Sequence, residues 1–92
     1  MYRLVYTKEA KTAIDGLPVK IKRQIKNAVE RISANPEIGK CLTQELKGLL
    51  SYRFGDYRVI YRVFHKEILV LILTVGHRKD IYRKTSGKVD NL

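Results

Sequence analysis

The sequence predicts an α+β fold in which an N-terminal strand and a helical hairpin pack on a small antiparallel β-sheet. Two patterns indicate this class. Apolar residues recur at helical spacing in the first part of the chain, whereas hairpin and strand patterns fill the part after residue 49. At 92 residues the chain is expected to form a single domain, 1–92, with one core and with residues 84–92 as a flexible tail.

The N-terminal elements are a strand and two helices. Residues 2–6 alternate Tyr, Leu and Tyr on one face, as a half-buried strand does. Thr7 is an acceptable helix start and Gly16 a natural stop, so a short helix is expected up to about Asp15. Pro18 suits the first turn of a second helix, which is expected to end near Asn35-Pro36. Its apolar stripe is Ile21, Ile25, Ala28, Val29 and Ile32.

The remaining residues predict an antiparallel meander. Strands over 51–54 and 57–64 flank Gly55-Asp56, where a Gly in the first position can adopt the positive φ of a type II′ turn. A short turn near His65-Lys66 then leads to a third strand over 67–75. That strand is β-branched or Leu almost throughout, which is typical of a strand buried on both faces.

Strand register places cations at one end of this sheet. In the predicted hairpin Arg53 lies directly opposite Arg58, on the same face. If the next turn pairs Phe64 with Glu67, Arg78 and Tyr82 follow the third strand at that same end. Repulsion between opposed like charges costs only ~0.2–1 kcal/mol. A bound anion explains the clustering more easily than folding does, and we expect a phosphate.

The charge balance agrees with a phosphate-rich or acidic partner. Lys and Arg number 19 against 9 acidic residues, which gives a net charge of +10, although solubilising charge is an alternative explanation. The single Cys41, expected to act as a small hydrophobe, cannot form an internal disulfide. Neither a signal peptide nor a membrane span is expected, so the predicted location is the cytoplasm. Scattered His and Cys residues predict no metal site, and no cofactor is expected.

The chain resembles the RelE/ParE superfamily of toxins from type II toxin–antitoxin systems over nearly its whole length, and is RelE-like. Two spaced motifs carry the resemblance: Gly55-Asp56-Tyr57-Arg58-Val59-Ile60-Tyr61, and Val75-Gly76-His77-Arg78 followed by Asp80-Ile81-Tyr82. The resemblance implies a ribosome-dependent, metal-independent endoribonuclease that cleaves mRNA in the A site and inhibits translation. It also implies a RelB-like antitoxin in a hetero-oligomer, and we expect acidic side chains on the segment of the antitoxin that contacts the toxin.

The resemblance also implies roles for individual residues. Arg58 and Arg78 match the arginines that contact the scissile phosphate, and Tyr82 matches the tyrosine proposed as general base. Further candidates for substrate or phosphate binding are Arg53, Lys47, His77 and Arg83. Packing against the sheet edge is an equally good explanation for Tyr82, and a structural role suits His77 better than acid–base catalysis.

Some features leave other functions open. RelE nucleases place lysines on the strand before the hairpin, whereas this chain has Leu49, Leu50 and Ser51 there. The alternatives are a ParE-like inhibitor of DNA gyrase and a non-catalytic module that binds RNA or the ribosome. The basic face of the second helix suits solvation and ribosome contact equally. Tyr57 and Tyr61 are expected to pack at the edge of the core rather than to stack on bases.

Overall fold

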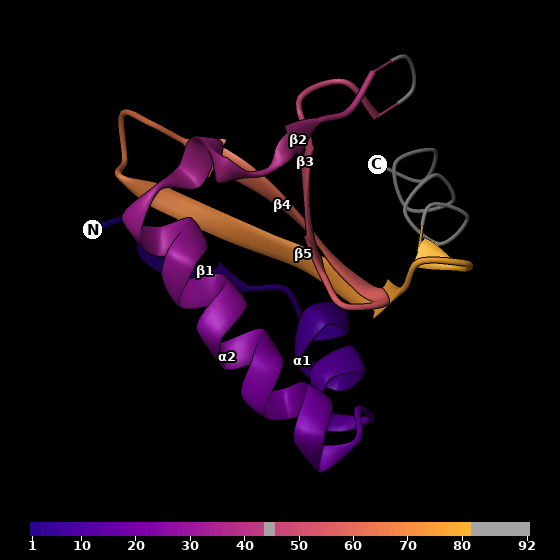
Figure 1. The fold of residues 1–92 in the computed structure, drawn as a ribbon. Helices are drawn as coiled ribbons and strands as arrows, with labels where there is room; N and C mark the ends of the chain where they lie inside the picture. The colour runs from indigo at the N-terminus through magenta and orange to yellow at the C-terminus, as the bar shows by residue number, and fades with distance from the viewer. Residues whose placement is uncertain (44–45, 82–92) are drawn as a thin grey trace.

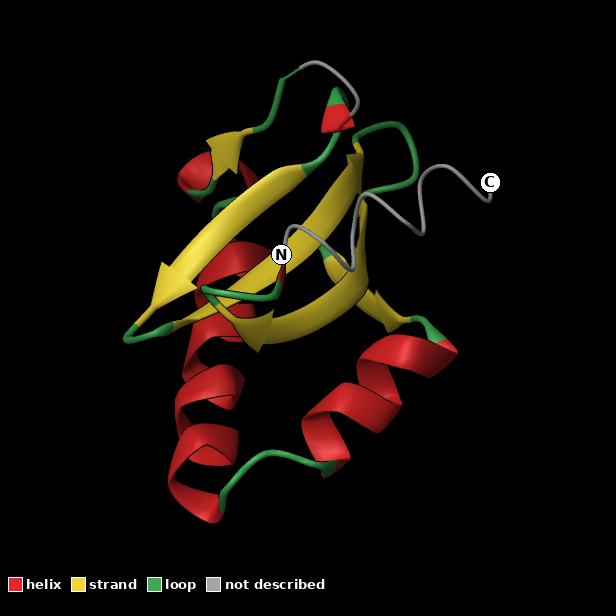
Figure 2. Ribbon diagram, turned by 90° about the vertical axis from the view of Figure 1, so that its right-hand side faces the viewer, coloured by secondary structure: helices red, strands yellow, loops and turns green. Residues whose placement is uncertain are grey.

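The computed structural model describes residues 1–43 and 46–81, and in it two helices pack on one face of a five-stranded sheet (Figures 1 and 2). The strand order is β1-β5-β4-β3-β2. The elements are β1 Arg3–Tyr6, α1 Lys8–Asp15, α2 Val19–Ala34, the 3-10 helix η1 Pro36–Ile38, β2 Lys40–Cys41, β3 Leu50–Phe54, β4 Tyr57–Phe64 and β5 Leu69–His77. The predicted α+β class is confirmed. The sheet is mixed rather than wholly antiparallel, because β1 adds to β5 in parallel.

The predicted helices are confirmed, with caps close to the expected residues. The Thr7 side chain caps α1 by accepting a hydrogen bond from the Ala10 amide at 3.0 Å, and Gly16 follows the last helical residue. Pro18 lies one position before the first residue of α2, and Asn35 ends that helix. The stripe of α2 is buried except for Ile21, which is half-buried.

The β3–β4 hairpin has the predicted register, with Phe54 paired to Tyr57 and Arg53 paired to Arg58. Gly55 has a φ of +59°, the positive value that the predicted turn requires. The β3, β4 and β5 strands form the expected antiparallel meander.

The predicted two-residue turn between β4 and β5 is wrong. Phe64 pairs with Leu69, not with Glu67, so the connection has four residues, and one of them, Ile68, has a φ of +51°. His65 in this loop is exposed, yet both of its ring nitrogens have partners. Its Nδ1 lies 2.9 Å from the Tyr2 hydroxyl, and its Nε2 lies 3.0 Å from a Glu37 carboxylate oxygen. These contacts join the loop to Tyr2 near the N-terminus and to Glu37 in η1.

A β-bulge at Leu73 reverses the side-chain alternation of β5. Tyr61 pairs with Ile72 and Ile60 pairs with Thr74, which leaves Leu73 without a Cα partner on β4. Val75 therefore faces the helices, whereas Gly76 faces the opposite side. Burial on both faces holds only after the bulge: Thr74 to Gly76 are buried, but Leu69, Leu71 and Leu73 are half-buried.

Two apolar clusters sit on the two faces of the sheet. The larger lies between the sheet and the helices, and Tyr61 is fully buried within it. The Tyr61 hydroxyl donates to the Pro36 carbonyl at 2.7 Å and accepts from the Gly39 amide at 2.9 Å. The smaller cluster, on the opposite face, is built on Leu49, Ile60 and Ile81.

Two other expectations concern exposure and membrane insertion. Cys41, expected to act as a small hydrophobe, is a free cysteine exposed at the edge of the sheet, so it contributes no side chain to the core. Within residues 1–43 and 46–81 no helix is long and apolar enough to cross a membrane. The tail expected over 84–92 lies outside the described residues.

Candidate functional site

The candidate site lies at the end of the β3–β4 hairpin, on the face of the sheet turned away from the helices. Tyr52, Phe54 and Val59 pack with the helix-side cluster. Because side chains alternate along a strand, Arg53 and Arg58 point to the opposite face. Arg53 is exposed and donates from Nε to the Gly55 carbonyl at 3.1 Å, whereas Arg58 is half-buried.

Arg78 contacts the hairpin turn between Arg53 and Arg58. Gly76 is the cross-strand partner of Arg58, and the chain leaves β5 one residue later. The Arg78 amide donates to the Asp56 carbonyl at 2.8 Å, and its Nε lies 3.9 Å from Asp56 Oδ1. Arg53, Arg58 and Arg78, which we name the basic tip, therefore lie at the same end of the sheet, although β5 pairs with β4 in a different register from the predicted one.

The electrostatics of the basic tip favour an anion. Arg53 and Arg78 contact the turn residues Gly55 and Asp56, and Arg58 is the cross-strand partner of Arg53. The carboxylate of the turn, Asp56, forms an exposed ion pair with Arg78. Exposed pairs of this kind contribute only ~0–1 kcal/mol. Guanidinium groups keep their charge at all physiological pH values and match the geometry of phosphate oxygens. The basic tip is therefore chemically suited to bind a phosphate group.

His77 does not join the basic tip. It pairs with Tyr57 across the strands, and the two rings meet edge to face at 5.6 Å between centroids, on the helix side of the sheet. Its Nδ1 accepts a hydrogen bond from the Lys79 amide at 3.2 Å. Tyr57 in turn stacks on Phe54 at 5.9 Å. His77 thus closes an aromatic row, and the bulge at Leu73 is the reason that it faces away from the arginines.

The other predicted site residues lie elsewhere or are not described. Lys47 is exposed in the segment before β3. It precedes Leu50 by three residues, and Leu50 lies a further three strand residues, or about 10 Å, from Arg53. The structure does not place Lys47 in the basic tip. Tyr82 and Arg83 lie outside the described residues.

The positions where RelE nucleases carry lysines are buried in this chain. Leu49 belongs to the cluster on the outer face, Leu50 to the helix-side cluster, and Ser51 is 3 % exposed. None of the three presents a charged group near the basic tip. This departure follows from packing: Leu49 contributes apolar surface against Ile60 and Ile81.

Arg62 is a cation of this face that was not singled out from the sequence. It follows Arg58 by four residues in β4, so both side chains lie on the same face. Its guanidinium carbon lies 5.1 Å from the centroid of the Phe64 ring, which shares that face. The alternation of Arg58, Ile60, Arg62 and Phe64 is the signal that identifies it.

The described part of the chain contains no group of three or more His, Cys, Asp or Glu side chains placed to hold a metal ion.

Comparison with known proteins identifies the class to which this fold and basic tip belong. The family model described as the ParE toxin of the type II toxin–antitoxin system parDE matches residues 4–82. The toxin RelG of Mycobacterium tuberculosis is 38% identical over 85 residues, which span 90% of this chain and 98% of RelG. The toxin RelE of the same organism is 33% identical over 84 residues, covering 89% of this chain and 87% of that protein.

Solved structures agree with this class. The toxin–antitoxin complex RelBE2 from M. tuberculosis contains a chain that matches with a TM-score of 0.76 and 35% identity, covering 83% of this chain and 96% of that chain. The isolated Escherichia coli RelE toxin matches with a TM-score of 0.74 over 97% of this chain and 99% of that chain, at 19% identity, and so shares the fold. This chain belongs to the RelE/ParE family and is a toxin of a type II toxin–antitoxin system. Two of the similar chains, those of RelBE2 from M. tuberculosis and of the archaeal RelE–RelB complex from Pyrococcus horikoshii, were solved in complexes with their partners.

Proposed function

We propose that this toxin is a metal-independent endoribonuclease that cleaves mRNA in the ribosomal A site and so inhibits translation in the cytoplasm. The convergence of Arg53, Arg58 and Arg78 at one end of the sheet is the observation that carries the proposal. The identity to toxins named RelG and RelE supports it.

The chemistry needs one base and several cations. In the proposed reaction Tyr82 takes the proton of the 2′-hydroxyl, the 2′-oxygen bonds to the adjacent phosphorus, and the bond from phosphorus to the 5′-oxygen breaks. Arg58 and Arg78 hold the phosphate and stabilise the charge that develops on it. A tyrosine is a weak base at its ordinary pKa of about 10, but neighbouring cations favour the phenolate.

Arg53 takes the phosphate-stabilising role that lysines of the preceding strand have in RelE nucleases. An always-protonated guanidinium is a poor proton donor to the leaving 5′-oxygen. In this proposal that oxygen takes its proton from water, and cleavage is slower than in a nuclease with lysines there.

The ribosome supplies what the small domain lacks. A chain of 10.7 kDa offers little surface on which to splay nucleotides and align the 2′-hydroxyl with the scissile bond. Orientation of reacting groups contributes up to about 7–11 kcal/mol to such reactions. We therefore expect cleavage only on ribosome-bound mRNA.

Primer-extension mapping of an mRNA on programmed ribosomes, with EDTA present, tests the proposal. The wild-type toxin is compared with Arg78→Ala, Tyr82→Phe and a control, Lys66→Ala, in the exposed β4–β5 loop far from the basic tip. Cuts in the A-site codon that need ribosomes, persist in the control and disappear in the two site variants are the expected result. Absence of cuts by folded wild-type toxin would refute the nuclease function.

Inhibition of DNA gyrase is the second candidate function. Two observations favour it: the matching family model is named for ParE, and Leu49, Leu50 and Ser51 are buried where RelE nucleases carry lysines. A gyrase supercoiling assay tests this function directly. Inhibition that survives Arg58→Ala and Tyr82→Phe would assign the basic tip a role other than RNA cleavage. A toxin that neither cuts RNA nor inhibits gyrase, but binds ribosomes with steep salt dependence, would be a non-catalytic binding module.

A further inference from the structure

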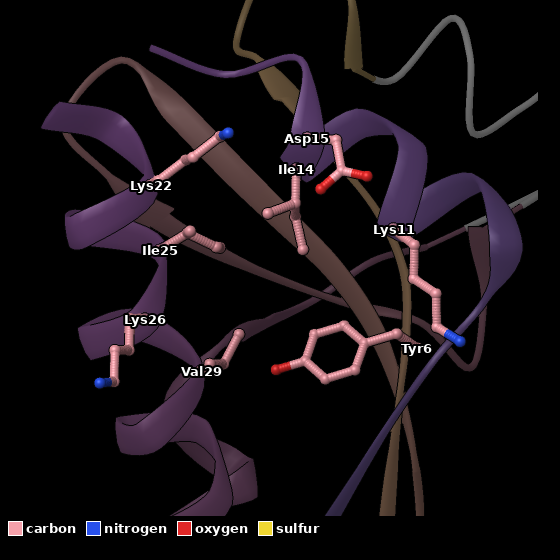
Figure 3. A pocket seen from close by; sticks show the side chains of 8 residues that line it. All are labelled: Tyr6, Lys11, Ile14, Asp15, Lys22, Ile25, Lys26 and Val29. Atoms are coloured by element: carbon pink, nitrogen blue, oxygen red, sulfur yellow. The ribbon is translucent and has the colours of Figure 1, made fainter. Parts of the chain in front are cut away.

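Two hollows flank α2 on the helix side of the sheet, and their linings differ. The larger, a trough of about 430 Å³ between α1 and α2, has an aliphatic floor in which Ile14 and Ile25 point toward one another (Figure 3). The two helices diverge from their tight connection, so the trough stays open (Figure 2). The smaller, a groove of about 220 Å³, lies between α2 and the β3–β4 hairpin and has polar and aromatic walls. The carboxamides and rings of this groove suit a planar polar ligand.

One stripe of α2 forms the first wall of the groove. It consists of residues at helix positions i, i+3, i+4 and i+7, namely Gln24, Asn27, Ala28 and Arg31. The buried Ala28 has only a methyl side chain, so it leaves room beside the three polar side chains. No hydrogen bond of either carboxamide is found within residues 1–43 and 46–81. Their donors and acceptors are therefore available to a ligand.

Tyr52 and Phe54 form the opposite wall, and both rings are held in place. The Tyr52 hydroxyl accepts a hydrogen bond from Arg31 Nη1 at 3.4 Å, and Phe54 stacks on Tyr57 at 5.9 Å between ring centroids. Side chains that are already ordered lose little conformational entropy when a ligand binds. Aromatic rings and guanidinium planes are the groups on which unpaired RNA bases stack.

The groove and the basic tip meet at Gly55, on the two sides of one hairpin. Gly55 lines the groove, and a Cβ placed there would lie 3.7 Å from Gln24 Oε1, so Gln24 reaches the turn from α2. The carbonyl of the same Gly55 accepts a hydrogen bond from Arg53 Nε at 3.1 Å. Among the described residues that line the groove there is no carboxylate to repel a phosphate. An RNA strand that crosses the end of the hairpin can thus place a phosphate at the arginines and a base in the groove.

We propose that the groove binds one unpaired purine base of the RNA strand whose phosphate lies at the basic tip. The inference deepens the proposed function, since it rests on RNA as the substrate, but it does not require cleavage. Pockets for drug-sized ligands have volumes of about 300–1,000 Å³, so about 220 Å³ suits a ligand as small as a single base. The base stacks against the rings of Tyr52 and Phe54. The carboxamides of Gln24 and Asn27 bond to its polar edge, as such groups do with adenine.

Removing base contacts and backbone charges separately tests the proposal. The test variant, Gln24→Ala/Asn27→Ala, removes both carboxamides without changing the net charge. The matched control, Lys20→Ala/Arg23→Ala, removes two exposed cations of the same helix that line neither hollow. Thermal melting first establishes that both variants are folded. Binding of fluorescein-labelled hexamers is then measured by fluorescence anisotropy at several salt concentrations, with oligoadenylate, oligouridylate and a strand of abasic ribose phosphates as probes.

The wild-type toxin should bind oligoadenylate more tightly than the other two probes. The test variant should bind oligoadenylate about tenfold more weakly than wild type, with its affinity for the abasic strand changed less than about twofold and its salt dependence unchanged. The control should keep the preference for oligoadenylate, because it alters only charge. Absence of this preference in wild type, or an equal loss of affinity for the abasic strand in the test variant, would overturn the proposal.

Failure of this inference and failure of the nuclease function give different results. Hexamer binding needs neither a ribosome nor a cut. A toxin that prefers oligoadenylate through the groove but never cleaves mRNA would refute the nuclease function alone. A toxin that cuts in the A-site codon, but whose test variant binds oligoadenylate as tightly as wild type, would refute the groove as a base-binding site alone.

Discussion

Arg53 of β3 and Arg58 of β4 are direct cross-strand partners on the outer face of the hairpin. Neighbouring strands lie about 4.8 Å apart, so the two arginine side chains start close together on the same face and their like charges repel. Opposed like charges of this kind disfavour folding. The arrangement disfavours folding of the free toxin, and we propose that its benefit lies in binding an anion.

Removing one of these charges should separate stability from function. We expect Arg53→Ala to raise the free energy of unfolding by ~0.2–1 kcal/mol at low salt, because the repulsion with Arg58 is lost. The same variant should lose affinity for RNA. Urea unfolding and RNA binding check the two effects, with Arg62→Ala as the control on the same face. Equal stability gains in both variants would mean that net charge, rather than the cross-strand pair, is responsible.

A side chain at Gly76 should press against Ile81. A Cβ at Gly76 would lie 3.0 Å from Ile81 Cδ1, and Ile81 is fully buried. We expect Gly76→Ala to lower the free energy of unfolding by about 1–3 kcal/mol through overpacking. Ile81→Val removes the clashing Cδ1 atom, so the double variant should recover part of this loss in a double-mutant cycle. Purely additive effects in the cycle would contradict the proposed clash.

The Tyr61 hydroxyl should contribute strongly to the free energy of unfolding. It is buried and hydrogen-bonded to the Pro36 carbonyl and the Gly39 amide, so Tyr61→Phe leaves a buried carbonyl and a half-buried amide without this partner. We expect a loss of about 1–3 kcal/mol in the free energy of unfolding, measured by chemical denaturation at neutral pH. Tyr6→Phe is the control, since no hydrogen bond of the Tyr6 hydroxyl is found among the described residues. A similar loss in the control would show that hydroxyl removal alone has this effect.

Tyr61 should also make stability depend on alkaline pH. Burial raises the pKa of Tyr61 to about 12 from 10.0, so the folded state keeps the phenol proton where the unfolded state releases it. Stability from this group is complete below pH 10 and falls as the pH rises toward 12, by at most about 1.4 kcal/mol per pH unit. Unfolding curves between pH 9 and 12 should show a steeper decline for wild type than for Tyr61→Phe, and parallel curves would refute the assignment.

Replacing Ile68 of the β4–β5 loop by Asn should stabilise the protein. Its φ of +51° is unfavourable for a β-branched residue, and its side chain is 56% exposed, so little burial is lost on substitution. Because Asn adopts this conformation more readily, Ile68→Asn should raise the free energy of unfolding by about 0.5–1 kcal/mol. Lys66→Asn in the same loop, where φ is not positive, serves as the control in thermal melts. A loss of stability in Ile68→Asn would mean that Ile68 packing outweighs the backbone strain.

Local patterns in the sequence determined the helices and the β3–β4 hairpin of this fold, and with the hairpin they determined the turn at Gly55 and the pairing of Arg53 with Arg58. The α2 stripe from Ile21 to Ile32 and the turn at Gly55 depend only on neighbouring residues, and both predictions are confirmed. The pairing of Arg53 with Arg58 follows from the hairpin turn alone, so the register could be derived without the rest of the molecule. The motifs on β4 and at the end of β5 indicated the family, which the comparisons confirm.

Only the tertiary structure decided the features that depend on contacts between distant segments. The Tyr2 and Glu37 contacts of His65 accompany a four-residue loop, and the bulge at Leu73 turns His77 away from the arginines. The contacts of the loop leave no local signal, because their partners are distant in the sequence. The bulge leaves none either, because one inserted residue reverses the direction of every side chain beyond it without changing the composition of the strand. The trough between α1 and α2 likewise arises from the angle at which two individually predictable helices diverge. Periodicity determines which face of a helix is apolar, but packing decides whether the protein itself covers that face.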